Sequence, residues 1–388
     1  MTFDLADRLT KLPPYLFAEI DRLKIEAKEA GHDIIDLGVG DPDLPTPAFI
    51  VDELYAQAQI QKNQQYPIGK GLPVFREAVS EWLKDRFSVS MDPATEITAT
   101  IGSKEAIAHF PLAYLNPGDL ALVPDPCYPP YKSGTTFAGA EFELMPLLKE
   151  NDFFPDFSQL DEATLKKAKI MFLNYPNNPT SACATKEFYE KVVALARRHE
   201  IIICSDLAYS EMAYDGEKPL SIFEVEGAKD VAIEFHSHSK TFNMTGWRLG
   251  FACGNAELVA ALAKVKSNID SGVFCAVQHA GIKALREGKD AVTKNVEIYK
   301  RRRDILVDGL RSLGYSLNNP KATFYLWIEV PKPYNSTDFC MKLLKEAHLI
   351  VTPGNGFGKT GEGYFRIALT VENTRLPEVI ERLRTIEV

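Results

Sequence analysis

The segment VAIEFHSHSKTFNMTGWRLGFACG, residues 231–254, places a lysine among hydroxyl groups after an apolar run. The run ends at Phe235, and the reactive side chains that follow within thirteen residues include Ser237, Ser239, Lys240 and Arg248. A lysine amine can bind an aldehyde as a Schiff base, whereas hydroxyls and a guanidinium can hold a phosphate. The segment therefore indicates covalent chemistry on a phosphorylated carbonyl compound.

Further polar side chains follow other apolar runs, and two stand at a predicted helix start. They are Tyr128 and Tyr131 after LALV, Asn178 after MFL, Asp206 and Tyr209 after IIIC, and Ser103 and Lys104 in IGSKEAIA. Ligands of parallel α/β sheets bind outside the carboxyl ends of the strands, so these side chains are expected to meet. Backbone N–H groups at the helix start also favour an anion.

The chemistry of this set matches one cofactor. A carboxylate such as Asp206 pairs with a pyridinium nitrogen, and a phenol with an amide holds a ring oxygen. Pyridoxal 5′-phosphate (PLP) combines an aldehyde, an aromatic cation and a phosphate, so the sequence predicts a PLP enzyme. Two alternatives stay open: Asp206 also fits a helix cap, and Tyr131 also fits plain packing.

Alternating strand and helix patterns must position these residues. KIMFLNYP (169–176) predicts a strand, TKEFYEKVVALARRHE (185–200) a helix, and IIIC (201–204) a second strand, which together form a βαβ unit. Further strands are predicted at LALVPDP (120–126), VAIEF (231–235) and RLGFACG (248–254). The pattern predicts an α/β fold with a mostly parallel sheet between helices.

The last third of the chain changes character and predicts a smaller α/β domain. Its elements are the helical YKRRRDILVDGLRSLG and DFCMKLLKEAH, the strand-like TFYLWIEVP, LIVTP and YFRIALT, and a closing helix. We expect a large PLP-binding domain over residues 47–285 and a small C-terminal domain over 286–388. Residues 1–46, with the helix LFAEIDRLKIEAKEAG, are expected to pack with the small domain.

Composition narrows the class of protein. A net charge of −9 over 388 residues argues against a nucleic-acid surface, and no apolar run approaches the length needed to cross a membrane. The six cysteines are scattered without a C-x-x-C pair and read as reduced, buried thiols, which predicts a cytoplasmic protein. His236 and His238 lack a third ligand of fitting spacing, so no metal site is expected.

The set Asn178, Asp206, Tyr209, Ser237-x-x-Lys240 and Arg248 resembles the signature of PLP-dependent aminotransferases of fold type I, and the resemblance runs from about residue 34 to GYFRIALT near 370. It implies that Lys240 carries the Schiff base and shuttles the Cα proton. It implies that Asp206 keeps the pyridine nitrogen protonated. Further implied contacts to the cofactor are Tyr209 and Asn178 at the ring oxygen, Tyr128 on the ring face, and Ser103, Lys104, Ser237 and Arg248 at the phosphate.

The same resemblance implies the substrate contacts and the assembly. Tyr66 resembles the tyrosine that reaches the phosphate of the neighbouring subunit, which implies a homodimer with shared active sites. Arg366, in GYFRIAL, resembles the arginine that pairs with the substrate α-carboxylate, helped by Asn178 and the backbone of Gly40. A purely structural Arg366 is the alternative. The glycine-rich PGNGFGKTGEG (353–363) departs from a nucleotide-binding P-loop and is expected to be a flexible loop leading to Arg366.

Several stretches, among them GSKEAIAHFPLAYLNPGD and HSHSKTFNMTGWRLGFACGNAEL, are similar to LL-diaminopimelate aminotransferases. This implies transfer of an amino group between LL-2,6-diaminopimelate and 2-oxoglutarate, in lysine biosynthesis. Gly69 departs from the pattern, because plant-type members carry a glutamate there that faces the distal end of the substrate. Asn268 and Ser271 are candidates for distal contacts to the neighbouring site, with a helix cap as their alternative. An aminotransferase for alanine, aspartate or another small amino acid, or a PLP carbon–sulfur lyase, remains the other reading.

Overall fold

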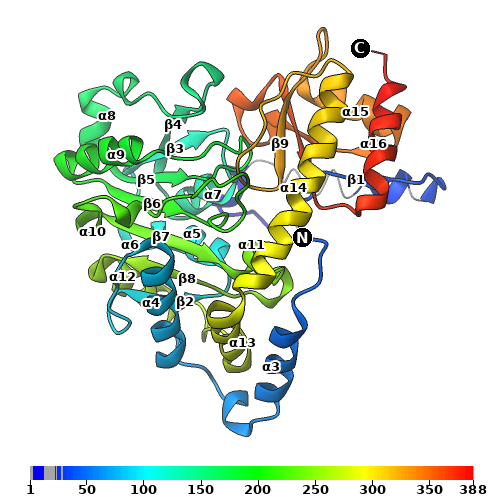
Figure 1. Ribbon diagram of the computed structural model, residues 1–388. Coiled ribbons are helices and arrows are strands. Elements are labelled where there is room, and N and C mark those ends of the chain that lie inside the picture. Colours follow the sequence, from blue (N-terminus) through cyan, green and yellow to red (C-terminus); the bar gives the residue numbers. More distant parts are fainter. Residues whose placement is uncertain (1–2, 13–21, 23, 28, 388) are drawn as a thin grey trace.

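A seven-stranded sheet forms the centre of the molecule (Figure 1). The computed structural model describes residues 3–12, 22, 24–27 and 29–387. The strand order is β2 (Ile97–Thr100), β8 (Gly250–Gly254), β7 (Ala232–Ser237), β6 (Ile202–Asp206), β5 (Ala168–Asn174), β3 (Leu120–Asp125) and β4 (Glu141–Pro146). The neighbours from β7 to β4 pair in parallel, and β8 runs antiparallel to both β7 and β2. The predicted mostly parallel sheet is confirmed.

Helices cover both faces of this sheet. On one face α5 (Ser103–His109), α6 (Pro111–Tyr114), α7 (Pro130–Phe137) and α12 (Ala256–Lys266) share a core with alternate strand residues. On the other face α8 (Glu162–Lys167), α9 (Lys186–His199) and α10 (Ala228–Val231) form a second core. The predicted helix α9 begins where Thr185 caps the N–H of Phe188 and buries the stripe Phe188, Val192 and Ala196. Because both faces are buried, the strands read as continuous apolar runs.

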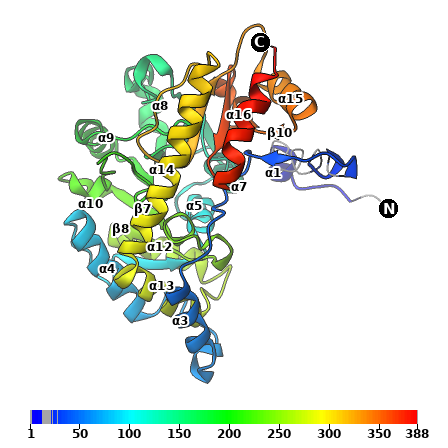
Figure 2. The same ribbon diagram turned by 45° about the vertical axis from the view of Figure 1, so that its right-hand side comes forward.

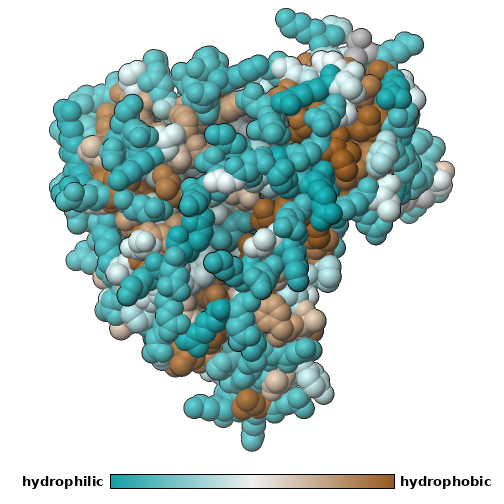
Figure 3. Space-filling view, viewed as in Figure 1, coloured by the Kyte–Doolittle hydropathy of each residue, from teal (hydrophilic) through white to brown (hydrophobic). Residues whose placement is uncertain are grey.

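A further helical group lies at the lower end of the molecule in Figures 1 and 2. It comprises α3 (Ala48–Ala58), the short helix η1 (Gln61–Gln64), α4 (Pro73–Phe87) and α13 (Cys275–Glu287), with α13 packed on α3 and α4. The face shown in Figure 3 is mainly hydrophilic, with hydrophobic residues showing at this lower end and at the upper right. Among the described residues, no helix is both long and apolar enough to span a membrane.

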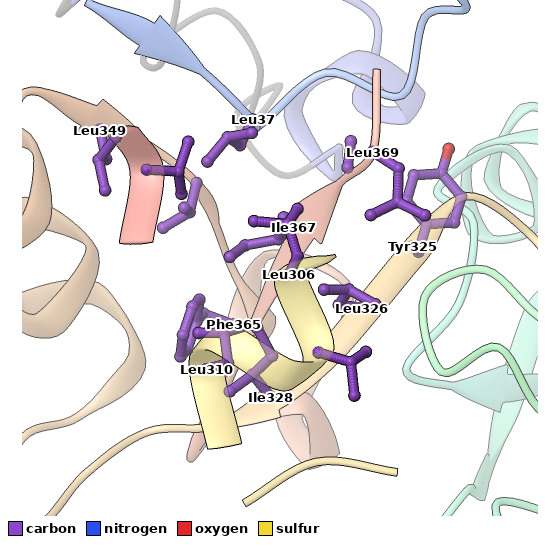
Figure 4. Packing of buried hydrophobic residues seen from close by; sticks show 14 of the residues in the cluster. Leu37, Leu306, Leu310, Tyr325, Leu326, Ile328, Leu349, Phe365, Ile367 and Leu369 are labelled. Atoms are coloured by element: carbon purple, nitrogen blue, oxygen red, sulfur yellow. The ribbon is translucent and has the colours of Figure 1, made fainter. Parts of the chain in front are cut away.

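The C-terminal third forms a separate layer around a three-stranded antiparallel sheet of β11 (Thr352–Pro353), β12 (Tyr364–Ala368) and β9 (Tyr325–Glu329). The helices α14 (Lys289–Ser312), α15 (Ser336–Ala347) and α16 (Leu376–Arg384) pack around it. In Figure 4 Leu306 and Leu310 of α14 meet Leu326 and Ile328 of β9 and Phe365 of β12. The helices and strands predicted for this part are confirmed.

The N-terminal segment joins this C-terminal layer. β1 (Ile35–Asp36) pairs in parallel with β10 (Leu349–Ile350), and Leu37 belongs to the same buried core. The helix predicted over residues 16–31 falls largely outside the described residues. The domain boundaries at 46 and 285 stay a prediction, which the pairing of β1 with β10 supports.

The long helix α14 runs from the end of α13 up to the C-terminal layer in both ribbon views (Figures 1 and 2). Arg302, on this helix, is almost fully buried. Its two terminal nitrogens donate to the two carboxylate oxygens of Asp43 at 2.7 and 2.8 Å. A planar guanidinium matches a carboxylate in this bidentate way, so α14 is held to the segment that follows Gly40.

Candidate active site

A cavity of about 430 Å³ opens where β5, β6 and β7 end. Its wall combines side chains from the seven-stranded sheet with residues 39–41 and with the C-terminal layer. The predicted residues that line it are Gly40, Ser103, Lys104, Tyr128, Asn178, Asp206, Tyr209, Ser237, Lys240, Arg248 and Arg366. The fold therefore gathers in one place groups that are spread over nearly the whole sequence.

Lys240 lies on a single helical turn, α11 (His238–Thr241), directly after β7. The Ser237 side chain caps this turn by accepting a hydrogen bond of 3.2 Å from the N–H of Ser239. The Lys240 amine donates to the carbonyl oxygen of Gly40 at 3.0 Å. The short turn thus points the amine across the cavity toward the N-terminal segment.

Burial changes the chemistry of this amine. The pKa of Lys240 is lowered to about 8, mainly by desolvation, against an opposing attraction from Asp41 and with a smaller contribution from the positive charges of Arg366 and Arg248. An ordinary lysine has a pKa near 10.4 and is almost entirely protonated at neutral pH. Lys240 therefore supplies far more neutral, nucleophilic amine than a surface lysine would.

Asp206 ends β6 and is buried at the base of the site. Its Oδ2 atom accepts a hydrogen bond of 2.7 Å from the hydroxyl of Tyr131, and its Oδ1 atom accepts one of 3.2 Å from the N–H of Ala208. Burial raises the pKa of Asp206 to about 6, and both hydrogen bonds oppose this rise. At neutral pH the carboxyl group is mainly ionised, as a partner for a ring cation must be.

Tyr209 and Asn178 each contact a side chain of the C-terminal layer. The Tyr209 hydroxyl lies 2.9 Å from the Tyr325 hydroxyl, and burial raises the pKa of Tyr209 well above its usual value. The backbone N–H of Asn178 donates to the Asn174 side chain at 2.8 Å, and its side-chain oxygen accepts from Arg366 at 2.8 Å, which orients the amide. Both side chains stay available as uncharged hydrogen-bonding groups.

Arg366 projects from β12 and is 1% exposed. It donates to the Asn178 amide oxygen at 2.8 Å and to the carbonyl oxygen of Gly38 at 2.7 Å. Its guanidinium carbon lies 4.1 Å from the ring centroid of Tyr325 and 4.7 Å from that of Phe357. Two rings and two acceptors fix this cation at the cavity wall.

Tyr325 and Phe357 were not identified by sequence reasoning, and both line the cavity. Tyr325 lies in a segment that predicted only a strand, and Phe357 lies in the glycine-rich loop. Only tertiary packing shows that both rings contact Arg366. Ser239 and Thr245 also line the cavity without having been assigned a role.

The residues expected at a phosphate form a cup of hydroxyls and cations, made by Ser103, Lys104, Ser237 and Arg248. Gly102 (φ 70°) makes this approach possible, because a Cβ atom there would lie 2.5 Å from an Arg248 nitrogen. The positive φ favours glycine here, and the end of the Arg248 side chain would have to shift to accommodate another residue.

Tyr66 and Asn268 lie away from this subunit's cavity. Tyr66 is 90% exposed, and the Asn268 side chain donates to the carbonyl oxygen of Lys264 at 2.8 Å. Their predicted contacts belong to the cavity of a neighbouring subunit and stay a prediction.

The loop after β11 has more regular structure than expected. It contains two 3₁₀ turns, η6 (Gly354–Gly356) and η7 (Lys359–Gly361). The backbone N–H and the hydroxyl of Thr360 each donate to the buried Asp125 carboxylate at 2.9 Å. This attachment to the end of β3 holds Phe357 against Arg366.

The histidine pair next to Lys240 serves the core. His236 lies 2.9 Å from the Glu234 carboxylate, which also accepts from Ser205 and Ser221. His238 is buried, and burial lowers its pKa to about 3. All six cysteines, which lie in the described part of the chain, are free thiols.

This geometry agrees with the comparisons with known proteins. Residues 32–383 match the family model described as "Aminotransferase class I and II". The chain therefore belongs to the class I and II aminotransferases, a family that is in general PLP-dependent.

Within this family, the chain is similar to the following proteins. A Maridesulfovibrio salexigens protein named LL-diaminopimelate aminotransferase is 56% identical over 382 residues, 98% of each chain. A protein of the same name from Syntrophobacter fumaroxidans is 54% identical over 99% of each chain. Among solved structures, substrate-bound BacF from Bacillus subtilis superposes with a TM-score of 0.95 and 39% identity, covering 99% of this chain and 98% of BacF.

Proposed function

We propose that this protein is a PLP-dependent aminotransferase that moves an amino group between LL-2,6-diaminopimelate and 2-oxoglutarate, in lysine biosynthesis. The substrate assignment rests on the 56% identity, over nearly the full length, to a protein named LL-diaminopimelate aminotransferase. The cavity supports the reaction class, because it holds a buried amine, a buried carboxylate and a fixed arginine.

The residues of the cavity fit the cofactor. When bound, PLP supplies an aldehyde that takes up the amino group and an electron-withdrawing ring that weakens the bonds at the substrate Cα. Lys240 meets the aldehyde with an amine whose pKa is lowered to about 8. The ionised Asp206 carboxylate matches the ring nitrogen, and Tyr209 with Asn178 matches the ring oxygen. Tyr128 lies at the ring face.

The phosphate of the cofactor fits the cup of Ser103, Lys104, Ser237 and Arg248 beside Gly102. A phosphate carries about two negative charges at neutral pH, and this cup offers two cations with two hydroxyls. The close packing of Arg248 on Gly102 supports the assignment, since it brings Arg248 against the helix that carries Ser103.

The remaining roles follow from the positions of two side chains. Arg366 binds the α-carboxylate of the amino acid, and the backbone of Gly40 with the amide of Asn178 lines the same region. The Lys240 amine, once released from its hydrogen bond to Gly40, moves a proton at the substrate Cα. Arg366 is buried, so its charge is fixed at the cavity wall where the α-carboxylate would bind.

The active enzyme is a homodimer with shared sites. Gly272 packs against Pro67 and Gly69 beside Tyr66, and large apolar side chains are exposed at Tyr55, Tyr66, Ile68, Ile269 and Phe274. Large exposed apolar side chains that gather on one face are typical of protein interfaces. In the dimer Tyr66 contacts the neighbouring subunit's phosphate, and Asn268 contacts its substrate. Six free cysteines fit a reducing compartment, so we place the enzyme in the cytoplasm.

Gly69 favours one second candidate, an aminotransferase for alanine, aspartate or another small amino acid. The distal ammonium of diaminopimelate needs a hydrogen-bond acceptor, and glycine at position 69 supplies no side chain for this purpose. A carbon–sulfur lyase is the less favoured alternative.

A panel of amino donors tests these candidates. The purified, PLP-loaded protein is mixed with LL-diaminopimelate, alanine or aspartate without an acceptor, and its visible absorption band is followed. Conversion by LL-diaminopimelate supports the proposal, whereas conversion only by alanine or aspartate overturns the substrate. Keto-acid product formed repeatedly without 2-oxoglutarate would identify a lyase. Lys240→Ala is the control that should remove every conversion.

A further inference from the structure

Tyr131 contacts the carboxylate at the base of the site. Its hydroxyl donates to Asp206 Oδ2 at 2.7 Å, and neither side chain is more than 5% exposed. Its ring stacks on Phe172 of β5, with centroids 5.0 Å apart and planes at 14°. Tyr131 is fully buried in the core between α7 and the sheet, so the hydroxyl has a fixed position.

We propose that Tyr131 is a positioning residue that fixes the Asp206 carboxylate and keeps it ionised for the ring nitrogen of the cofactor. The inference rests on the proposed function, since it concerns the same cofactor. It gives Tyr131 a task that plain packing does not require.

The electrostatics of the pair explain this task. Burial penalises the charged form of Asp206, and a hydroxyl that donates to the carboxylate stabilises that form. Burial and the adjacent Asp206 raise the pKa of Tyr131 itself well above its usual value, so it stays a donor at physiological pH. The other titratable groups that act on Asp206 lie on β7: His236 lowers its pKa, and Glu234 raises it.

The pair also has a directional effect. With Oδ2 bound to Tyr131 and Oδ1 bound to the Ala208 N–H, the carboxylate cannot rotate without breaking both hydrogen bonds. A carboxylate oxygen can accept more than one hydrogen bond, so both oxygens keep capacity for a ring N–H. Without the phenol, Asp206 would have one anchor and a higher pKa.

The test compares wild-type protein with Tyr131→Phe, which keeps the ring and its stacking. The readout is the dissociation constant of PLP from cofactor-free protein at about pH 6 and about pH 8.5. Because every other pH-dependent group is the same in both proteins, the ratio of the two dissociation constants isolates the missing hydroxyl. Tyr315→Phe is the matched control, since the buried hydroxyl of Tyr315 has no hydrogen-bond partner among the described residues.

At about pH 6 we expect Tyr131→Phe to bind PLP about fivefold more weakly, because losing a hydrogen bond to the charged carboxylate raises the pKa of Asp206 by about one unit from about 6. The variant should bind more weakly because, at this pH, a smaller fraction of its Asp206 is ionised than in the wild-type protein. At about pH 8.5 Asp206 is ionised in both proteins, so the dissociation constants should agree within about twofold. In an Asp206→Asn background, Tyr131→Phe should have no further effect at either pH.

A ratio that is the same at both pH values would overturn the role of Tyr131 while leaving the proposed function intact. Wild-type protein that fails to bind PLP would overturn the proposed function and this inference with it. If Tyr131→Phe does not fold, 3,5-difluorotyrosine placed at Tyr131 makes a stronger donor of the same shape. It should tighten PLP binding at about pH 6, and weaker or unchanged binding there would count against the proposal.

Discussion

The Nζ atom of Lys240 donates a hydrogen bond of 3.0 Å to the carbonyl oxygen of Gly40, a residue 200 positions earlier in the chain. Gly40 can approach so closely because it lacks a side chain. A Cβ atom there would lie 2.0 Å from the Tyr325 hydroxyl oxygen. Three distant parts of the sequence therefore meet at one backbone carbonyl.

Gly40→Ala should displace the Tyr325 ring and, with it, the neighbouring Arg366. Overpacking of this kind costs about 1–3 kcal/mol of folding free energy. We expect a lower melting temperature and an increase in KM for the amino donor, measured by thermal unfolding and steady-state kinetics. Gly246→Ala is the control, because a Cβ atom there meets no other atom within 4 Å. Equal effects of the two substitutions would contradict the contact.

Lys240→Met should stabilise the cofactor-free protein. The pKa of Lys240 is lowered from 10.5 to about 8 by burial, so a charged Lys240 opposes folding. The cost is fully present below about pH 8 and shrinks as the pH rises toward 10.5, where the amine is neutral in both states. At neutral pH the gain should be roughly 2–3 kcal/mol, measured by urea unfolding. The exposed Lys345 provides the control substitution, and a gain that does not decline at high pH would speak against the lowered pKa.

Asp206→Ala should keep the fold and lose most of the catalytic rate. The side chain supplies a fixed charge to the ring, and loss of one preorganised electrostatic group lowers kcat by about 100-fold or more. Circular dichroism checks the fold, and steady-state kinetics with saturating cofactor measures kcat. Near-normal turnover would remove the electron-sink role from Asp206.

Thr360→Val should loosen the glycine-rich loop. The change removes the hydroxyl that donates to Asp125. The Asp125 carboxylate keeps its ion pair with Lys132, at 2.7 Å, and its hydrogen bond from the Thr360 backbone N–H. Because Phe357 would be held less firmly against Arg366, we expect KM for the amino donor to rise several-fold with a smaller change in kcat. An unchanged KM would show that the loop keeps its position without this hydroxyl.

Mixed dimers test the shared site. Lys240→Ala and Tyr66→Ala subunits should each be weakly active alone. If Tyr66 serves the neighbouring subunit, half of the dimers in an equal mixture contain one intact site. Activity should then recover to about a quarter of the wild-type value after unfolding and refolding together. The absence of recovery would contradict the contribution of Tyr66 to the neighbour's site.

The sequence predicted the sheet because its strands are buried on both faces and read as apolar runs, as in 169–176 and 201–204. It also predicted the reactive side chains, because parallel strands bring their carboxyl ends to one edge. It could not predict that Tyr325 and Phe357 enclose Arg366, since their segments carry no chemical signal. The hydrogen bond from Tyr131 to Asp206 was likewise beyond pattern reasoning, because it joins residues 75 positions apart.

The bidentate ion pair between Arg302 and Asp43 links α14 of the C-terminal layer to the segment that follows Gly40. Asp43 lies three residues after Gly40, and Arg302 is rooted in the C-terminal core. A rotation of the C-terminal layer against the central sheet would carry Asp43 with it and shift the carbonyl that receives the Lys240 amine. A motion far from the reacting atoms would thereby change the position of the Lys240 amine.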